Sequence, residues 1–418
     1  MVKLLRHPTR AILSVMVAAV LVVGMLGWYR VSAQPIVGKL GLNIAGPNWI
    51  NMDPRAFDQF ITNVANSGAG WTFLPVVWYN FEPDPPFFPP PSPPNSPVCG
   101  VEPQGWRYYL GPSGKCHHYY IMSLQAVVDG LRTNGHTIAM GMYGHPTWAG
   151  GGPDVVFAKN NNGSIVYRDH LPLFSEAATD LAHFLVDEYK PAAFSVWNEP
   201  NGFRYLSIEP DWSRVRCCFT FPEWEDYARY LLWPIYYDLR YKLQSSVMII
   251  GPELATANNG DYGGNAWDEN FGVHVGHWND DWNDYLARYY GWAIDRWSVH
   301  AYGNAWQDTP NNVVNWTLNK IGRYSVWRPI WVTEANMVGG CNHTQRSRAN
   351  WICNVNRTQW WDQTFWMGAS DSDTCTAYNS PDEVTGGGLM GAPWNDYWPK
   401  WLLQAHYAVL AGAYYCGL

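Results

Sequence analysis

Two acidic residues, Glu199 and Glu334, each end a short apolar segment of the kind that forms a buried strand. Residues 194–199 read Phe-Ser-Val-Trp-Asn-Glu, and residues 330–334 read Ile-Trp-Val-Thr-Glu. A carboxylate buried without partners costs folding energy, so a purely structural reason for either acid is hard to supply. Two carboxyls about 5 Å apart can cleave a glycosidic bond with retention, because one attacks the anomeric carbon while the other protonates the leaving oxygen.

A third acid competes with this pair. Glu253 also follows an apolar segment, residues 247–251, and therefore also stands at the end of an expected strand. We interpret it as a loop or substrate-binding residue rather than as a group that reacts.

The elements that must position these acids alternate along the chain. Short apolar segments are separated by stretches with helical periodicity about eight times, which predicts a (β/α)8 TIM barrel. The expected strands are residues 38–44, 71–79, 137–143, 194–198, 247–251, 297–302, 330–333 and 364–369. The expected helices are residues 55–67, 119–134, 173–189, 223–243, 282–292 and 398–410. An open doubly wound sheet also alternates, but no glycine-rich phosphate-binding sequence follows the first strand.

The chain is longer than a minimal barrel of about 250 residues, and the additional residues are distributed unevenly. Long irregular stretches follow the expected strands, whereas the segments that lead from a helix into the next strand are short. Loops after strands gather at the C-terminal face of a barrel, where barrel enzymes build their active sites. We therefore expect long loops on the C-terminal face, one of them a stiff proline-rich flap at residues 82–97.

The two acidic segments together resemble a known family group. The sequence Asn198-Glu199-Pro200 after the fourth expected strand, with Glu334 after the seventh, is similar to clan A of the glycoside hydrolases. That clan includes cellulases, β-mannanases and β-xylosidases on TIM barrels. The resemblance implies that Glu199 is the general acid/base, that Glu334 is the nucleophile, and that Asn198 hydrogen-bonds the sugar 2-hydroxyl.

The same resemblance implies roles for four further residues. His300 and Tyr302 match a pair near the nucleophile, and we expect the Tyr302 hydroxyl to hold the Glu334 carboxylate and keep its pKa low. Trp148 resembles a platform on which a sugar stacks, and Trp366 is assigned to the floor under the reacting sugar. One departure stands out: many clan members place an arginine in the second strand, where this chain has Phe73.

Composition bounds the partners. The 418 residues carry a formal charge of −8 and no basic run beyond the N-terminus, so a nucleic-acid partner is not expected. The same balance disfavours a polyanionic substrate. With 26 Trp and 26 Tyr, the chain holds more aromatic residues than core packing requires, and flat rings with a polar edge suit sugars. We expect a neutral glycan as substrate, with no cofactor and no metal.

The N-terminus has the features of a targeting segment. Residues 1–34 combine basic residues, an apolar run at residues 11–28 and small residues at 31–33, as a signal peptide does. The apolar run is also long enough to span a bilayer, so an uncleaved signal anchor that tethers the protein to the membrane is the alternative. Either way residues 35–418 form one exported catalytic domain, extracellular or at the cell surface.

Export lets the eight cysteines form disulfides. Apart from the adjacent Cys217 and Cys218, the pairs closest in sequence are Cys99 with Cys116 and Cys341 with Cys353. Sequence alone leaves the connectivity open.

The sequence predicts a retaining hydrolase of β-linked neutral glycans, and the proline-rich flap and the aromatic content favour endo action on a polymer. Three alternatives stay open. The same site could transfer sugars to an acceptor other than water, the chain could be a non-catalytic glycan-binding protein, or it could be an exported structural or adhesion protein. Sugar identity and oligomeric state are open as well.

Overall fold

A computed structural model gives the fold. It describes residues 40–44, 54–65, 67, 69–89, 99–151, 165–201, 206–209, 223–255, 266–268, 273–275, 279–302, 310–336, 343–344, 347–348, 350–352, 355, 359–367 and 384–385. The chain divides into a unit of residues 1–37, which lies outside the described residues, and a unit of residues 38–418. The predicted division into residues 1–34 and 35–418 stays a prediction.

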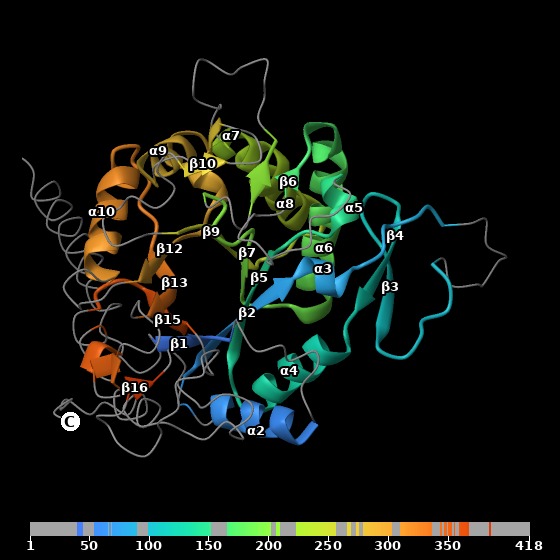
Figure 1. Ribbon diagram of the computed structural model, residues 1–418, viewed down its shortest axis with the longest axis horizontal. Helices are drawn as coiled ribbons and strands as arrows, with labels where there is room; N and C mark the ends of the chain where they lie inside the picture. Colours follow the sequence, from blue (N-terminus) through green and yellow to red (C-terminus); the bar gives the residue numbers. More distant parts are fainter. Residues whose placement is uncertain are drawn as a thin grey trace, which may run out of the picture. The chain divides into compact units, whose positions relative to one another are not determined.

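Eight parallel strands close into a barrel in the order β1-β15-β13-β12-β9-β7-β5-β2 (Figure 1). Their bounds are β1 (Leu40–Asn43), β2 (Trp71–Val77), β5 (Thr137–Tyr143), β7 (Ala193–Ser195), β9 (Met248–Leu254), β12 (Arg296–Tyr302), β13 (Ile330–Asn336) and β15 (Gln363–Met367). All eight overlap the expected strands, although β7 ends three residues before the end of the expected 194–198, and the (β/α)8 barrel is confirmed. Most of these strands are buried on both faces, as in other all-parallel sheets.

One layer of side chains fills the barrel interior near the N-terminal ends of the strands. Its members alternate with residues that face the helices, and they are Phe73, Ala139, Ala193, Ile250, Trp331 and Phe365. The rings of Phe73 and Phe365 meet edge to face, with centroids 5.8 Å apart. A Cβ on Gly41 would lie 2.6 Å from the Phe365 ring, so only glycine leaves room for that ring.

Helices cover the outside of the barrel (Figure 1). They are α2 (Pro54–Ala65), α4 (Met122–Thr133), α6 (Leu171–Tyr189), α9 (Asn279–Tyr290), α10 (Pro310–Gly322) and a continuous run of α7 (Glu223–Tyr227), η3 (Ala228–Leu232), α8 (Trp233–Tyr237) and η4 (Asp238–Lys242). Shorter elements are α3 (Trp78–Phe81), α5 (Thr147–Gly150), η2 (Arg168–His170), η5 (Gly291–Ala293), β6 (Ile165–Val166), β8 (Ser207–Ile208), β10 (Ala266–Asp268), β11 (Val273–Val275), β14 (His343–Thr344) and β16 (Val384–Thr385). The expected helix at 398–410 lies outside the described residues, and α10 is an additional helix.

The loop after β2 contains a hairpin that was not expected, and residues 119–120 of the helix expected at 119–134 belong to it. Strands β3 (Trp106–Leu110) and β4 (Cys116–Tyr120) pair antiparallel and stand beside α3, outside the ring of strands (Figure 1). The start of the proline-rich flap is tied to this hairpin by backbone hydrogen bonds in both directions between Phe87 and Cys116. A disulfide joins Cys99 to Cys116, which confirms that pairing. Cys341 and Cys353 lie outside the described residues.

Membrane association through residues 11–28 stays a prediction. In the part of the chain that the structure describes, no helix has both the length and the apolar character needed to cross a bilayer. Residues 11–28 are not among those described.

Candidate active site

A β-bulge turns Glu334 into the barrel. The interior position of Trp331 would place residue 333 inside and residue 334 outside if β13 alternated regularly. The register between β12 and β13 shifts after the Val299–Val332 pair, so that His300 lies opposite Glu334. Bulges commonly re-aim a side chain beside an active site. Here the bulge brings Glu334, 8% exposed, to the side of the strand that carries His300.

Glu199 reaches the same place from a loop. It follows β7 with a left-handed backbone, φ +42°, which a non-glycine residue adopts only at a cost of about 1–3 kcal/mol. Its backbone N–H donates to the carbonyl of Glu253 at 3.2 Å, so the loop after β7 is held against β9. Two hydrogen bonds between Asn201 and the backbone of Ala255 strengthen the same connection.

His300 lies between the two acids. Its Nδ1 is 2.8 Å from Oε1 of Glu199 and 3.4 Å from Oε2 of Glu334. The Tyr302 hydroxyl, two residues further along β12, donates to Oε2 of Glu334 at 2.5 Å. One oxygen of each carboxylate and a nitrogen of His300 all lie within 4.8 Å of one another. The structure therefore brings together four of the seven residues that the sequence placed in the site.

The charges in this cluster influence one another. Burial by itself lowers the pKa of His300, but Glu334 and Glu199 outweigh burial and raise it to about 9, so the imidazole is protonated at neutral pH. Burial raises the pKa of Glu334, and the neighbouring Glu199 adds to this, while His300 and the Tyr302 hydrogen bond oppose it. The expectation of a low pKa at Glu334 is wrong in its net direction, although Tyr302 acts as expected.

The Glu253 side chain is buried and is not exposed to a ligand. It is 1% exposed, its φ is +52°, and it occupies a register shift between β9 and β12. The Ser298 hydroxyl accepts its backbone N–H at 2.9 Å. Burial raises the pKa of the Glu253 carboxyl to about 8, so this acid is mostly uncharged at neutral pH. The interpretation of Glu253 as a loop or substrate-binding residue is therefore wrong.

Comparison with known proteins bears on the fold. No protein-family model and no curated protein sequence matches this chain. Solved structures do match it. A family 39 glycoside hydrolase from Bacteroides cellulosilyticus WH2 shares 14% identity at a TM-score of 0.52, over 90% of this chain and 64% of that one. A glucosidase from Croceicoccus marinus shares 12% identity at a TM-score of 0.52, over 90% of this chain and 66% of that one.

A trimodular endoglucanase shares 12% identity at a TM-score of 0.50, over 91% of this chain and 60% of that one. This chain shares its (β/α)8 barrel fold with these glycoside hydrolases. This chain spans 60 to 66% of the length of the three solved chains, and at these identities the likeness shows the fold alone. The barrel that the clan A resemblance implied is thus confirmed, and the roles of individual residues stay proposals.

The clan A resemblance implied two further residues near the acids. Asn198 is half-buried and directly precedes Glu199 on the loop after β7. Trp148 lies in α5, after β5, and is half-buried. Its indole N–H donates to the backbone carbonyl of Glu82 at 3.3 Å, and its ring meets Trp78 at 90°. The segment that follows β2 therefore holds the Trp148 side chain in place.

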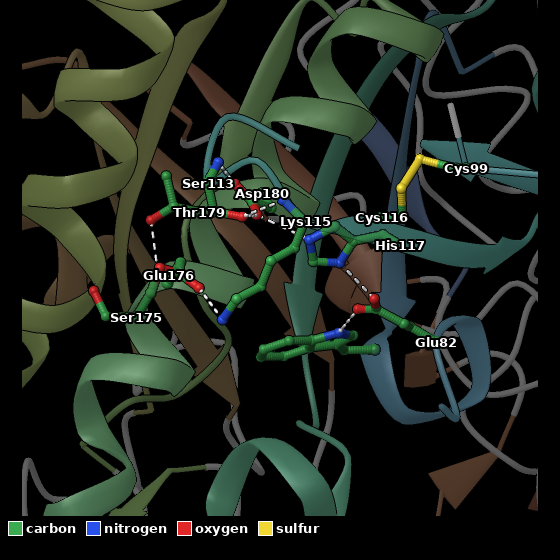
Figure 2. Close-up of polar contacts among 11 residues, drawn as sticks. Glu82, Cys99, Ser113, Lys115, Cys116, His117, Ser175, Glu176, Thr179 and Asp180 are labelled. Atoms are coloured by element: carbon green, nitrogen blue, oxygen red, sulfur yellow. Dashed lines mark hydrogen bonds and ion pairs between the residues drawn. A yellow bond between two sulfur atoms is a disulfide. The ribbon is translucent and has the colours of Figure 1, made fainter. Parts of the chain in front are cut away.

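A buried ionic network fixes that segment (Figure 2). His117 of β4 lies between Glu82, at 2.6 Å from Nδ1, and Asp180 of α6, at 2.8 Å from Nε2. The two carboxylates outweigh burial and raise the pKa of His117 to about 9. Trp78 donates to the other oxygen of Glu82 at 2.8 Å, and the Ser113 hydroxyl donates to Asp180. The network joins the hairpin, α3 and α6 to Glu82, whose backbone carbonyl accepts the Trp148 hydrogen bond.

Trp366 does not reach the site. It follows Phe365, whose ring fills the barrel interior, and β15 pairs regularly with β1, so alternation points Trp366 at the outer layer. There it is 3% exposed and meets the Trp351 ring edge to face at 5.4 Å. The assignment of Trp366 to the floor under a sugar is therefore wrong in this structure.

Other residues orient Glu334 in place of the arginine that many clan A members carry in the second strand. Phe73 is 2% exposed and belongs to the layer of side chains inside the barrel. Its side chain has no group that could donate a hydrogen bond to Glu334. Tyr302 and His300 orient Glu334 instead. Sequence reasoning missed Tyr143, the last residue of β5, whose pKa is raised by burial and by the nearby Glu334. Its place at a strand end was the signal available for finding it.

Glu199, His300 and Glu334 also have the spacing of three metal ligands. Within the described ranges this is the one such group of His, Cys, Asp and Glu. A metal binds the neutral imidazole, whereas the two carboxylates hold His300 in its protonated form. The cluster thus favours a proton where a metal would sit, and a metal-free mechanism stays a prediction.

Proposed function

We propose that this protein is a retaining glycoside hydrolase that cleaves β-linked neutral glycans. The observation that supports this most strongly is the approach of Glu199 and Glu334, with oxygens within 4.8 Å of each other. Retaining glycosidases hold their carboxyl groups about 5–5.5 Å apart, whereas inverting enzymes leave about 6.5–9.5 Å for a water molecule. The short separation favours a covalent intermediate.

In the first step Glu334 attacks the anomeric carbon while Glu199 gives its proton to the leaving oxygen. This requires Glu334 ionised and Glu199 protonated. With His300 protonated, its charge balances that of the ionised Glu334, which lowers the cost of burying the carboxylate. The Tyr302 hydrogen bond and the His300 charge both favour the ionised form of Glu334, against the effect of burial.

In the second step Glu199, now ionised, takes a proton from water, and the hydroxide releases the sugar from Glu334. Asn198 is next to Glu199 and is assigned to the sugar 2-hydroxyl. Trp148 supplies a half-buried indole whose position is fixed by Glu82 and Trp78. An indole of this kind suits the apolar face of a neutral sugar ring.

The substrate and its place are part of the proposal. We infer endo action on a polymer, supported by the aromatic content and by the flap and hairpin after β2. The Cys99–Cys116 disulfide agrees with an exported protein, because disulfides persist in oxidising compartments. The signal peptide or anchor at residues 1–34 would place the domain outside the cell or at its surface.

The test is hydrolysis of aryl β-glycosides and of β-glucan, mannan and xylan by the parent and two variants. Glu199→Ala and Glu334→Ala should each lower kcat on at least one substrate by roughly 10²-fold or more. Added azide should restore turnover in Glu334→Ala by replacing the nucleophile, and should give a glycosyl azide.

Glu102→Ala is the matched control, because Glu102 is 38% exposed on the segment before the hairpin. It should keep parental activity. Full activity in Glu199→Ala or Glu334→Ala would show that the reacting carboxylates have been misassigned. A parent that hydrolyses none of the substrates, yet binds a glycan, would instead favour a non-catalytic binding protein. Products longer than the substrate, formed with an added acceptor, would identify a transglycosidase.

A further inference from the structure

A cluster of aromatic side chains lines a pocket on the outside of the barrel. The pocket has a volume of about 360 Å³. Its lining residues come from α8, the end of α9 and η5, and are Trp233, Tyr285, Tyr289, Tyr290 and Trp292. Every one of the five is an aromatic residue with a polar edge, and we refer to them as the aromatic pocket.

The rings are exposed to an extent unusual for such large side chains. Trp233 is 39% exposed, and Tyr289 and Trp292 are each 49% exposed. Exposed apolar groups gathered in one place mark an interaction site more often than single exposed residues do. These exposed rings therefore account for part of the surplus of tryptophan and tyrosine in the sequence.

The pocket is also rigid. Trp292 packs edge to face against Trp233, with centroids 5.3 Å apart, and against Tyr236, at 5.0 Å. Its indole N–H is fixed by a 2.9 Å hydrogen bond to the carbonyl of Tyr289. Because the rings already support one another, little conformational entropy is lost when a ligand binds.

The aromatic pocket is separate from the acidic cluster. Trp292 lies between the end of α9 and the start of β12, and hence near the end of the barrel where the strands begin. Glu199 and Glu334 lie at the ends where β7 and β13 finish, on the opposite side. The aromatic pocket is therefore not part of the site formed by Glu199 and Glu334.

The charges beside the pocket favour an uncharged ligand. Arg240 pairs with Asp295, and Lys242 pairs with Asp238 at 3.3 Å. Arg288 lies over the Tyr289 ring, 5.0 Å from its centroid. Arg328, which donates to the Gly291 carbonyl beside Trp292, is a further cation near the pocket. With Arg240 and Lys242 paired, Arg288 and Arg328 provide fewer free charges than the cluster of about 4–8 Lys/Arg on a surface that binds anionic lipid.

We propose that the aromatic pocket is a second glycan-binding site, which takes the apolar faces of neutral sugar rings of a polysaccharide. Rings with apolar faces and polar edges match the C–H faces and hydroxyl rim of a pyranose. Such a site holds the protein on a polymer independently of Glu199 and Glu334. The inference concerns binding alone and does not require that Glu199 and Glu334 be catalytic.

The test is retardation in native gels that contain soluble β-glucan, glucomannan or arabinoxylan. All proteins carry Glu334→Gln, so that the polymer is not digested. Trp292→Ala and Trp233→Ala should each weaken binding to the retarding polymer at least about fivefold. Trp292→Tyr, which keeps an aromatic face, should restore most of the affinity and shows that a loss in Trp292→Ala is not unfolding.

Trp360→Ala is the matched control, since Trp360 is also 49% exposed with its indole N–H bonded, to Asn311, but lies outside the pocket. It should bind like the parent. In the protein with Glu334 intact, Trp292→Ala should leave kcat/KM on a small aryl glycoside unchanged. Loss of polymer binding and loss of hydrolysis are therefore measured separately, and the second glycan-binding site can fail without the proposed hydrolysis failing.

Equal retardation of Trp292→Ala and the parent would overturn the proposal, as would a parent that none of the polymers retards. Two other occupants would also overturn it. Binding to phosphatidylcholine–phosphatidylglycerol vesicles that depends on Trp292 would identify a membrane surface. A dimer that becomes a monomer in Trp292→Ala, measured by light scattering, would identify a second copy of the chain.

Discussion

The Tyr302 hydroxyl donates a 2.5 Å hydrogen bond to Oε2 of Glu334 on the neighbouring strand. This contact orients the carboxylate in a chain that has Phe73 where many clan A members have an arginine. It also lowers the pKa of Glu334, against the larger effect of burial. The tyrosine thus favours the ionised form that a nucleophile needs.

Tyr302→Phe tests this role. Loss of the hydrogen bond should lower kcat roughly 10²-fold, as loss of one preorganised donor does elsewhere. The pKa of Glu334 should rise further, so the acidic limb of the kcat/KM profile should move to higher pH. Rates on an aryl β-glycoside across a pH series measure both effects. A lower kcat with an unmoved acidic limb would mean that Tyr302 acts by packing alone.

Glu253→Gln tests the third carboxyl. The pKa of Glu253 is raised from 4.5 to about 8, so the folded protein keeps a proton that the unfolded chain releases across this range. Stability should therefore fall as pH rises from about 4.5 to 8. Glutamine cannot ionise, so the variant should lack this part of the decline and gain stability over the parent towards pH 8. Urea unfolding at several pH values measures it, and parallel profiles would contradict the assignment.

His117→Gln tests the network in Figure 2. The pKa of His117 is raised from 6.5 to about 9, so its stabilising charge is fully present below pH 6.5 and is lost as pH rises through 9. Removing one partner of a buried ionic group costs about 3–5 kcal/mol. The variant should be less stable by an amount of this order at pH 6, with the difference shrinking towards pH 9.5. A deficit that stays constant over this range would show that the histidine is uncharged in the folded protein.

Trp148→Ala tests the proposed sugar platform. A residue that binds ground state and transition state equally should raise KM with little change in kcat. We expect KM on an oligosaccharide to rise roughly fivefold or more, while an aryl monoglycoside is affected less. Trp78→Phe is a useful comparison, because it removes the 2.8 Å bond to Glu82 and keeps an aromatic ring against Trp148. A fall in kcat alone would place Trp148 at the reacting bond.

The barrel could be predicted from the pattern of apolar residues within each segment of the sequence. All eight strands were predicted, because a strand buried on both faces is a continuous apolar segment that periodicity detects. The hairpin of β3 and β4 was missed, since β3 is only partly buried and β4 buries a polar residue, His117, so no apolar alternation marks them. Its pairing depends on the disulfide of Cys116 and on the bonds that His117 makes to distant residues.

The site was predictable where a motif fixed the residue and the strand end together. Glu199, Glu334, His300 and Tyr302 met this condition, and the structure brings them together. Trp366 failed because inward and outward positions alternate along β15, and a shift of one residue reverses the face. The burial of Glu253 depends on a register shift between strands, which the sequence does not display.

The most direct test of the central claim is the configuration of the first product. Proton NMR should follow hydrolysis of the best aryl β-glycoside, or of a β-linked oligosaccharide, from the first turnovers onwards. Because Glu199 and Glu334 approach within 4.8 Å, the β-anomer should appear first, and mutarotation should then form the α-anomer. Initial appearance of the α-anomer would show inversion and contradict Glu334 as nucleophile.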